Sequence, residues 1–307
     1  MMPRHISLIF PGQGSQSIGM LNSFSGDEFD SVSKISTEVL EIDIVDCIKN
    51  GPEKVLNKTS ITQPALLIAS YLYYKKFLDL FDITPNLLAG HSLGEYSALV
   101  ASNSIKLDDA ISLVHKRGKC MEKSQKGSMF AILNLDINEI NQICKVVEEE
   151  TGQIISPANI NSPNQVVIAG SDEAATIAAE KCKEAGAKRC IQLKVSVASH
   201  CNLMYEAASL FKKELDKHKF YTPEISIIHN VDAKIEEDIT NIPKKLTEQL
   251  TLPVQWTKTM EYIKTFDGIV IECGPAKVLS GLAKTNGLDN ILSMSSESFE
   301  DDLKKLL

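Results

Sequence analysis

Leu87-Leu-Ala-Gly-His-Ser-Leu-Gly-Glu-Tyr-Ser-Ala-Leu-Val100 is the most informative segment of this 307-residue chain. It places an apolar strand pattern, Leu87–Ala89, before Gly-His-Ser-Leu-Gly at 90–94, and a helix-compatible run, Glu95–Val100, after it. A Gly-x-Ser-x-Gly sequence between a strand and a helix is typical of a nucleophile elbow. The glycines allow a sharp turn that lifts the Ser92 hydroxyl clear of the backbone, and the helix start directs N–H groups towards developing negative charge. A turn without function is the alternative, and the flanking elements disfavour it.

The segments on either side alternate between strand-like and helix-like patterns, which is typical of an α/β fold with a largely parallel sheet. His5–Phe10 is predicted to be a strand that ends in a loop at 11–16. A long helix is predicted to begin near Thr62, with Thr62 as its N-cap residue and Pro64 in its first turn.

The middle of the chain has a different order of elements. From Gly127 the pattern predicts strand, helix, strand, strand, helix and strand, at 128–135, 137–149, 153–158, 165–169, 173–185 and 189–195. This β-α-β-β-α-β order is that of a ferredoxin-like unit. We therefore predict a small ferredoxin-like domain at 127–196, inserted into a larger α/β domain made of 1–126 and 197–307.

A nucleophilic serine needs a base within hydrogen-bond reach, and the chain offers six histidines. His91 adjoins Ser92, but neighbours on a tight turn normally point apart. His218 lies between two lysines, as expected on a solvated helix face. His200 follows an apolar strand pattern, where a catalytic loop residue would be expected. It is therefore a candidate for the base, although spacing alone does not decide between the histidines. No carboxylate stands out as the third member of a triad.

Arg117 falls on an apolar helix face. One stripe of a helix from Leu107 to Lys123 is apolar and consists of Ala110, Val114, Gly118 and Met121. Arg117 lies in the middle of that stripe, and a buried guanidinium needs a partner because an unpaired buried charge is costly. Two partners are open: an internal Asp or Glu in a structural salt bridge, or the carboxylate of a substrate, which the planar guanidinium fits well.

The loop after the first predicted strand, Gly12-Gln-Gly-Ser-Gln16, has the position of a phosphate-binding loop but not its sequence. Ser17 stands where a G-x-G-x-x-G motif has its third glycine, and the Lys-Ser/Thr of a P-loop is absent. What remains is a glycine loop whose backbone N–H groups can approach another group closely. An oxyanion hole and a plain turn are equally compatible with it.

Composition disfavours several classes of protein. Hydrophobic residues make up 43% and charged residues 23%, the ordinary globular range, and no apolar run reaches the roughly 18 residues of a membrane span. The N-terminus shows no secretory pattern, so a cytoplasmic protein is expected. A net charge of −8 argues against nucleic-acid binding. The seven cysteines form no C-x-x-C pair, which argues against a disulfide framework and a zinc site; Cys201 is the one of interest, because it follows His200.

Taken together, these motifs resemble those of the malonyl-CoA:acyl-carrier-protein transacylase family; similar acyltransferase domains occur in fatty-acid and polyketide synthases. The matching segments cover nearly the whole chain. No single segment identifies the family, but their order and spacing taken together are highly specific for it. They are Phe10–Gln16, Thr62–Ala65, Ala89–Leu99, Arg117–Lys119, Asn161–Pro163, Gln165–Gly170, Val195–His200, Asn230–Val231, Gln249, Pro253–Trp256 and Glu272–Pro275. The fold implied by the resemblance is an α/β-hydrolase-like core with a parallel sheet and a ferredoxin-like insertion, in agreement with the predicted order of elements.

The resemblance implies catalytic roles for three positions. Ser92 would attack the malonyl thioester, and His200 would take the serine proton and later return one to the leaving thiol. In this family the base is oriented by a main-chain carbonyl, here that of Gln249, in place of a carboxylate. That agrees with the absence of an obvious third acid in the sequence.

Four further positions are implied to bind the substrate or its transition state. The main-chain N–H groups of Gln13 and Leu93 would form the oxyanion hole, and Arg117 would hold the free carboxylate of the malonyl group. Gln63 matches a position that lines the pocket. Ala198 departs from the family pattern, since bacterial members often have proline there, in a stretch that related polyketide acyltransferases use to choose the extender unit.

The implied reaction is a double displacement. Malonyl-CoA forms malonyl-Ser92 and free CoA, and the phosphopantetheine thiol of an acyl carrier protein then takes the malonyl group, which supplies fatty-acid synthesis. No metal or redox cofactor is implied, and a monomer is expected. Carriers of this pathway are acidic, so docking on this acidic chain requires a local basic patch. The candidate patches are Lys188-Arg189 with Lys194, and Lys277 with Lys284. The alternative is that both groups are ordinary solvated lysines.

Three other functions stay open. A free-standing acyltransferase of a polyketide synthase would share the chemistry and use another carrier. An esterase or thioesterase of the α/β-hydrolase type is expected to show a carboxylate in its triad and no buried arginine. A nucleotide-binding or catalytically silent interaction module is the third.

Overall fold

The larger of two sheets is parallel throughout, in the order β7-β2-β1-β8-β9. The computed structural model describes residues 4–195 and 197–307; the N-terminal three residues and Ser196, the last residue of the predicted insertion, lie outside the described residues. The strands of this sheet are β1 (Ile6–Phe10), β2 (Leu87–Gly90), β7 (Ser226–Ile228), β8 (Ile269–Glu272) and β9 (Ile291–Ser293). The predicted α/β fold with a parallel sheet is confirmed.

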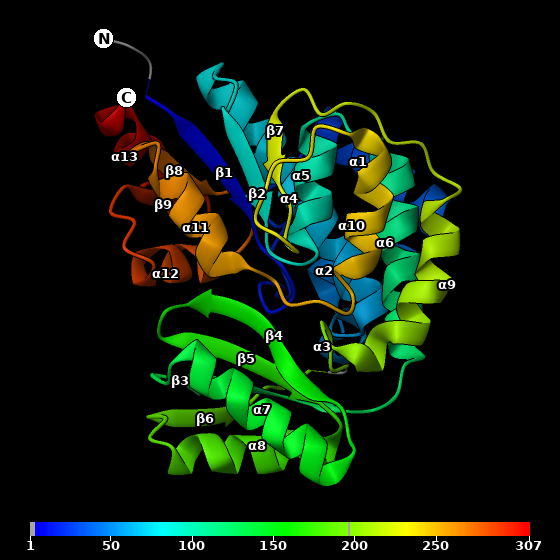
Figure 1. The fold of residues 1–307 in the computed structure, drawn as a ribbon. Helices are drawn as coiled ribbons and strands as arrows, with labels where there is room; N and C mark the ends of the chain where they lie inside the picture. Colours follow the sequence, from blue (N-terminus) through cyan, green and yellow to red (C-terminus); the bar gives the residue numbers. More distant parts are fainter. Residues whose placement is uncertain (1–3, 196) are drawn as a thin grey trace.

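Helices cover both faces of this sheet, because its strands are apolar on both sides. Leu8 and Phe10 of β1 pack into one core with α4, α5 and α6, whereas Ile9 packs into another with α11 and α12. Figure 1 shows these two groups of helices on opposite sides of the sheet. The helices outside the middle of the chain are α1 (Asp27–Leu40), α2 (Ile44–Asn50), α3 (Glu53–Leu56), α4 (Thr59–Phe81), α5 (Gly94–Ala101), α6 (Leu107–Glu122), α9 (Tyr205–Leu215), α10 (Ile242–Glu248), α11 (Trp256–Lys264), α12 (Val278–Thr285) and α13 (Phe299–Leu306).

The second sheet is formed by the middle of the chain and is antiparallel, in the order β4-β5-β3-β6 (Figure 1). Two helices pack against it, and their apolar residues form a core made only of residues between 130 and 190. The elements follow the predicted order, although β4 reaches further than expected and β6 ends earlier. They are β3 (Ser128–Leu133), α7 (Ile137–Thr151), β4 (Ile155–Ser162), β5 (Gln165–Gly170), α8 (Asp172–Glu184) and β6 (Arg189–Gln192).

The start of α4 corrects one prediction. The helix begins at Thr59, so Thr62 lies inside its first turn and is not the N-cap residue; its hydroxyl donates to a preceding carbonyl at 2.6 Å. Pro64 therefore lies in the second turn, where it has no N–H to donate to the carbonyl of Ser60. That carbonyl accepts from Nδ1 of His115 at 2.7 Å, which replaces the bond missing from the helix. Among the described residues, no helix is both long and apolar enough to span a bilayer.

Candidate active site

Ser92 lies on a strained turn between β2 and α5. Its backbone φ is +52°, in the left-handed region that residues other than glycine rarely adopt. The turn is tight, because a Cβ on Gly90 would lie 1.9 Å from the carbonyl carbon of Gly94, and a Cβ on Gly94 would lie 2.0 Å from the carbonyl oxygen of Phe10. Only glycine fits at these two positions. The geometry matches the elbow expected from the sequence.

His200 faces Ser92 from a loop that lies far along the chain. Its Nε2 lies 2.8 Å from Oγ of Ser92, and its Nδ1 lies 2.6 Å from the main-chain carbonyl oxygen of Gln249. A carbonyl can only accept, so Nδ1 carries the proton and Nε2 accepts from the serine hydroxyl. His200 also has a left-handed φ, +63°, and its main-chain N–H donates to the carbonyl of Leu250 at 3.0 Å. The structure thus brings these three predicted residues into one chain of hydrogen bonds.

The surroundings of His200 favour its neutral form. Its pKa is lowered to about 3, chiefly by burial of the ring and next by the positive charge of Arg117. The hydrogen bond to Gln249 acts in the opposite direction, because it stabilises the protonated ring. An imidazole with this pKa is neutral at pH 7, which is the state that a general base needs.

Arg117 is fully buried on the apolar stripe of α6. Its guanidinium donates to the side-chain oxygens of Gln63 and Gln249, both at 2.8 Å, and to Oγ of Ser92 at 3.3 Å. No described residue forms an ion pair with it, so the structural salt bridge that the sequence left open is not formed within the described chain. Burial lowers the pKa of Arg117, and the ring of Tyr96 lies 5.5 Å from the guanidinium. Its direct amide acceptors are neutral, and the carboxylate of Glu95 acts on it only through its charge, which raises the pKa of Arg117 in opposition to burial.

Gln63, which the resemblance implies to line the pocket, is fully buried in α4 and accepts a hydrogen bond from the guanidinium of Arg117. Its amide nitrogen points to the sulfur of Met121 at 3.3 Å. Neither Gln63 nor Arg117 is among the residues that line the cavity described below, and Gln63 supports the guanidinium from the interior.

The main-chain N–H groups of Gln13 and Leu93 have no hydrogen-bond partner among the described residues. Gln13 belongs to the loop after β1, and Leu93 directly follows Ser92. That loop packs against the elbow, because a Cβ on Gly12 would lie 2.5 Å from the carbonyl oxygen of His91. The loop after β1 and the elbow are thus in contact, and each contains one of these two N–H groups.

A cavity of about 430 Å³ is lined by Ser92 and His200. Gln13 lines it from the loop after β1, and Met129 and Asn159 line it from the second sheet. The segment that leads to the histidine also contributes to its wall, with Leu193, Lys194, Val195 and Val197. The cavity therefore lies between the two sheets, and its volume is in the range of small-molecule sites.

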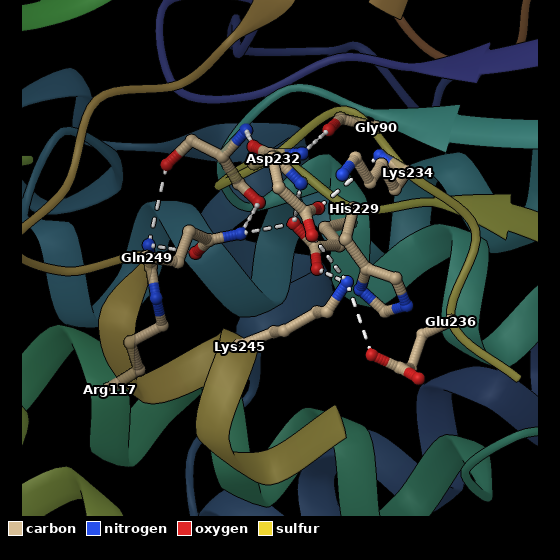
Figure 2. A network of polar contacts seen from close by, with 11 residues as sticks. Gly90, Arg117, His229, Asp232, Lys234, Glu236, Lys245 and Gln249 are labelled. Atoms are coloured by element: carbon tan, nitrogen blue, oxygen red, sulfur yellow. Dashed lines mark hydrogen bonds and ion pairs between the residues drawn. The ribbon is translucent and has the colours of Figure 1, made fainter. Parts of the chain in front are cut away.

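Two residues without a predicted role hold this arrangement together. Asn230 bridges the elbow, since its Oδ1 accepts from the N–H of Ser92 at 2.6 Å and its Nδ2 donates to the carbonyl of Gly90 at 2.6 Å. Glu95 accepts from the N–H of Asn230 at 3.0 Å and from Nε2 of Gln249 at 2.7 Å. Figure 2 shows this network around Gln249. The sequence does contain one indication of a role for Glu95, because it is the only charged residue in the helix-compatible run Glu95–Val100.

Three residues considered from the sequence lie outside these contacts. Cys201 is buried, and burial raises the pKa of its thiol to about 11, which leaves almost no thiolate near neutral pH. His91 bonds through Nε2 to Oδ1 of Asn161 at 2.9 Å and not to the adjacent serine. The prediction of a solvated His218 is wrong, because its Nδ1 bonds to the carbonyl of Glu214 at the end of α9 and its side chain is only 9% exposed.

The described residues hold no group of three or more His, Cys, Asp or Glu side chains placed to bind a metal ion. All seven cysteines are free thiols. Four of them, at 144, 182, 201 and 273, are buried and pack as small apolar residues.

A model of the acyl transferase domain family matches residues 7–296 of the chain. The malonyl CoA-acyl carrier protein transacylase of Haemophilus influenzae is 45% identical over 290 residues, which cover 92% of this chain and 92% of that protein. The protein of the same name from Bacillus subtilis is 39% identical over 290 residues, which cover 91% of this chain and 89% of that one.

Solved structures of similar proteins share the fold. The malonyl CoA-acyl carrier protein transacylase of Coxiella burnetii superposes with a TM-score of 0.94 at 36% identity, covering 99% of this chain and 98% of that one. The malonyl-transacylase PlMCAT, solved in complex with a type II PKS acyl-carrier protein, has a TM-score of 0.92 at 41% identity, covering 98% and 99%. Both likenesses extend over nearly the whole of each chain.

Proposed function

The chain belongs to the acyl transferase domain family, and we propose that it transfers the malonyl group of malonyl-CoA to the phosphopantetheine thiol of an acyl carrier protein, which supplies fatty-acid synthesis. One observation carries the choice of acyl group: the buried guanidinium of Arg117 lies 3.3 Å from Oγ of Ser92 without a carboxylate partner among the described residues. A carboxylate on the acyl group would supply that partner. The relatives named as malonyl CoA-acyl carrier protein transacylases support the same choice.

In the first half-reaction, Oγ of Ser92 attacks the thioester carbonyl of malonyl-CoA while Nε2 of His200 takes the hydroxyl proton. The carbonyl of Gln249 stabilises the imidazolium through Nδ1. The N–H groups of Gln13 and Leu93 donate to the oxyanion of the tetrahedral intermediate. The carbon–sulfur bond then breaks, and the CoA sulfur leaves with the proton from His200.

The second half-reaction reverses these roles. The carrier's thiol gives its proton to Nε2 of His200 and attacks the ester carbonyl of malonyl-Ser92. The ester bond breaks, and Oγ of Ser92 takes the proton back. Arg117 holds the malonyl carboxylate through both steps, while Gln63 and Gln249 keep its guanidinium in place. The serine is regenerated, and malonyl carrier is released.

An esterase or thioesterase is less well supported. Such an enzyme is expected to orient its base with a carboxylate, whereas Nδ1 of His200 bonds to a main-chain carbonyl. It also has no use for a buried guanidinium beside the nucleophile. A polyketide carrier as the acceptor is the second candidate, favoured by the 41% identical relative in complex with a type II PKS carrier. Transfer rates to carriers of both kinds separate these alternatives.

We further propose that the chain is divided into two domains. Residues 127–196 form an inserted ferredoxin-like domain, supported by the strand order β4-β5-β3-β6 and by the separate core of this region. Residues 1–126 and 197–307 form the α/β-hydrolase-like catalytic domain. The proposed reaction uses side chains and main-chain N–H and carbonyl groups of the chain together with its two substrates, so it requires no cofactor. A monomer in the cytoplasm stays a prediction.

Intact-protein mass spectrometry tests the proposed nucleophile. Malonyl-CoA is expected to add one malonyl group to the wild type, which peptide mapping locates on Ser92, and none to Ser92→Ala. Acyl carrier protein should then remove the label and become malonylated. A label on Cys201 or on any other residue would overturn the assignment, as would a wild type that takes no label.

A further inference from the structure

Glu95 is a buried carboxylate one turn after Ser92 that the mechanism above does not use. Its side chain is 1% exposed, and both of its oxygens accept hydrogen bonds. Oε1 lies 2.7 Å from Nδ1 of His229, which is equally buried, and Oε2 accepts from the N–H of Asn230 and from Nε2 of Gln249. Burial of a carboxylate is costly unless such bonds compensate it. Two of the partners that compensate it, Asn230 and Gln249, are also bonded to Ser92, Arg117 and His200.

Asn230 holds the backbone on both sides of the nucleophile. Its side chain accepts from the N–H of Ser92 and donates to the carbonyl of Gly90, so it spans the residue with the left-handed φ. A strained turn of this kind persists only where its surroundings hold it. The N–H of Asn230 is in turn fixed by Glu95 at 3.0 Å, which sets the position of the clamp.

Gln249 connects the remaining groups, and the carboxylate decides which way its amide faces. A carboxylate can only accept, so Nε2 of Gln249 must face Glu95, and Oε1 must then face the guanidinium of Arg117. Nε2 also donates to the carbonyl of Ser92 at 3.1 Å. The main-chain carbonyl of the same residue accepts from Nδ1 of His200. Figure 2 shows Gln249 between the arginine and the rest of the network.

We propose that Glu95 is a positioning residue for both half-reactions, acting through Asn230 and Gln249. This inference rests on the proposed function. Through Asn230 the carboxylate holds the turn that carries the nucleophile. Through Gln249 it directs an amide oxygen to the guanidinium and keeps a carbonyl against the base. A purely structural glutamate would change the stability of the fold but not the rate per folded molecule.

Two substitutions of Glu95 separate placement from charge. Glu95→Ala removes the acceptor for Asn230 and Gln249. Glu95→Gln keeps an amide oxygen for both, while its NH₂ group donates to Nδ1 of His229 in the other tautomer. At saturating malonyl-CoA, single-turnover acylation of Ser92 should slow about a hundredfold in Glu95→Ala. In Glu95→Gln it should stay within about tenfold of the wild type, because the contacts persist. Transfer to the carrier should follow the same order.

A matched control is Glu272→Ala. Glu272 is also fully buried, and its carboxylate accepts from the N–H groups of Leu279 and Ser280 at the start of α12, outside the residues that line the cavity. This variant should lose thermal stability yet keep the acylation rate per folded molecule. Circular dichroism and active-site titration give the amount of folded, active protein to which the rate is normalised. Should Glu95→Ala fail to fold, Glu95→Met fills the volume without accepting a hydrogen bond and must show the same loss.

The outcomes distinguish this inference from the function on which it rests. A wild type that takes no malonyl group overturns the proposed function and this inference with it. A wild type that is labelled, together with a folded Glu95→Ala of equal rate, overturns the inference alone. So does a Glu95→Gln that is as slow as Glu95→Ala, because the charge and not the placement of contacts would then matter.

Discussion

Arg117 and His200 both contact Oγ of Ser92, and the charge of the arginine acts on the histidine. The guanidinium is the second cause, after burial, of the lowered pKa of His200. In the proposed reaction a malonyl carboxylate meets the guanidinium and offsets its charge, so the imidazole becomes a stronger base when an acidic acyl group is in place. Recognition of the carboxylate and strength of the base are thereby coupled through a single residue.

The lowered pKa of His200 predicts a flat pH profile. The base must be neutral, and with a pKa of about 3 it is neutral from about pH 5 to about pH 8, so kcat/KM for malonyl-CoA should show no fall centred near 6.5. His200→Ala should be at least about a hundredfold slower across the range. Rapid-quench acylation between these pH values measures both. A fall with an apparent pKa near 6.5 would show that a solvated histidine is the base.

The same shift has a consequence for stability. The unfolded chain binds a proton at His200 near pH 6.5, whereas the folded chain does not bind it until about pH 3. Because the unfolded state then binds more protons, this residue lowers the free energy of unfolding as the pH falls below 6.5. Thermal unfolding of the wild type and of His200→Ala should therefore diverge in mild acid, with the variant relatively more stable there than at pH 8.

At the scale of elements, patterns that one segment determines by itself could be predicted. The strand and helix around Ser92 follow from a short apolar run and two glycines, and the stripe of α6 places Arg117 inside. The start of α4 could not be found in this way. Thr62 looks like a cap residue, but its hydroxyl is used inside the first turn, and the carbonyl freed by Pro64 is satisfied by a histidine of another helix.

Local sequence patterns also do not predict contacts between segments that are distant in the chain. The bond from His200 to the carbonyl of Gln249 joins residues 49 positions apart, and only a resemblance to known enzymes pointed to it. The bonds of Glu95 to Asn230 and Gln249 join residues more than 130 positions apart. Glu95 follows β2 and Asn230 follows β7, and these neighbouring parallel strands bring their carboxyl ends to one edge of the sheet. His200 and Gln249 do not follow strands of this sheet, so no single segment encodes their contacts.

At the scale of the whole molecule, an acidic chain exposes a basic residue at its cavity and others further away. Its net charge is −8, but Lys194, which follows β6, is exposed and lines the cavity, whereas Lys188 and Arg189 are exposed at the opposite end of β6. Lys284, at the end of α12, is also exposed. An acidic carrier that reaches the cavity would meet opposite charge at Lys194, and one that covers more of the surface would also meet Lys188, Arg189 or Lys284.

Charge reversal tests this docking surface. Lys188→Glu with Arg189→Glu, and separately Lys284→Glu, should raise the KM for acyl carrier protein in a salt-dependent manner and leave acylation by malonyl-CoA unchanged. Lys34→Glu on α1 is a matched control, since Lys34 is exposed and pairs only weakly with Glu38 at 4.0 Å. Equal effects on both half-reactions would mean that the substituted residues do not form the docking face.

The proposed role of Arg117 in binding the malonyl carboxylate can be tested by its substitution. Charge-assisted hydrogen bonds from a buried guanidinium to a carboxylate contribute about 1.5–3 kcal/mol each. Arg117→Ala should therefore lose about two or more orders of magnitude in kcat/KM for malonyl-CoA. Acetyl-CoA, which has no carboxylate to bind, should lose far less. A structural role predicts instead a large fall in Tm with parallel losses on both substrates.

The decisive measurement is the ratio of kcat/KM for malonyl-CoA to that for acetyl-CoA, in the wild type and in Arg117→Ala, with thermal unfolding of both proteins as the control. The ratio should collapse by about a hundredfold in the variant while the protein stays folded at the assay temperature. A malonyl preference that persists in the variant would mean that Arg117 does not bind the malonyl carboxylate, and it would contradict the main argument for the proposed function.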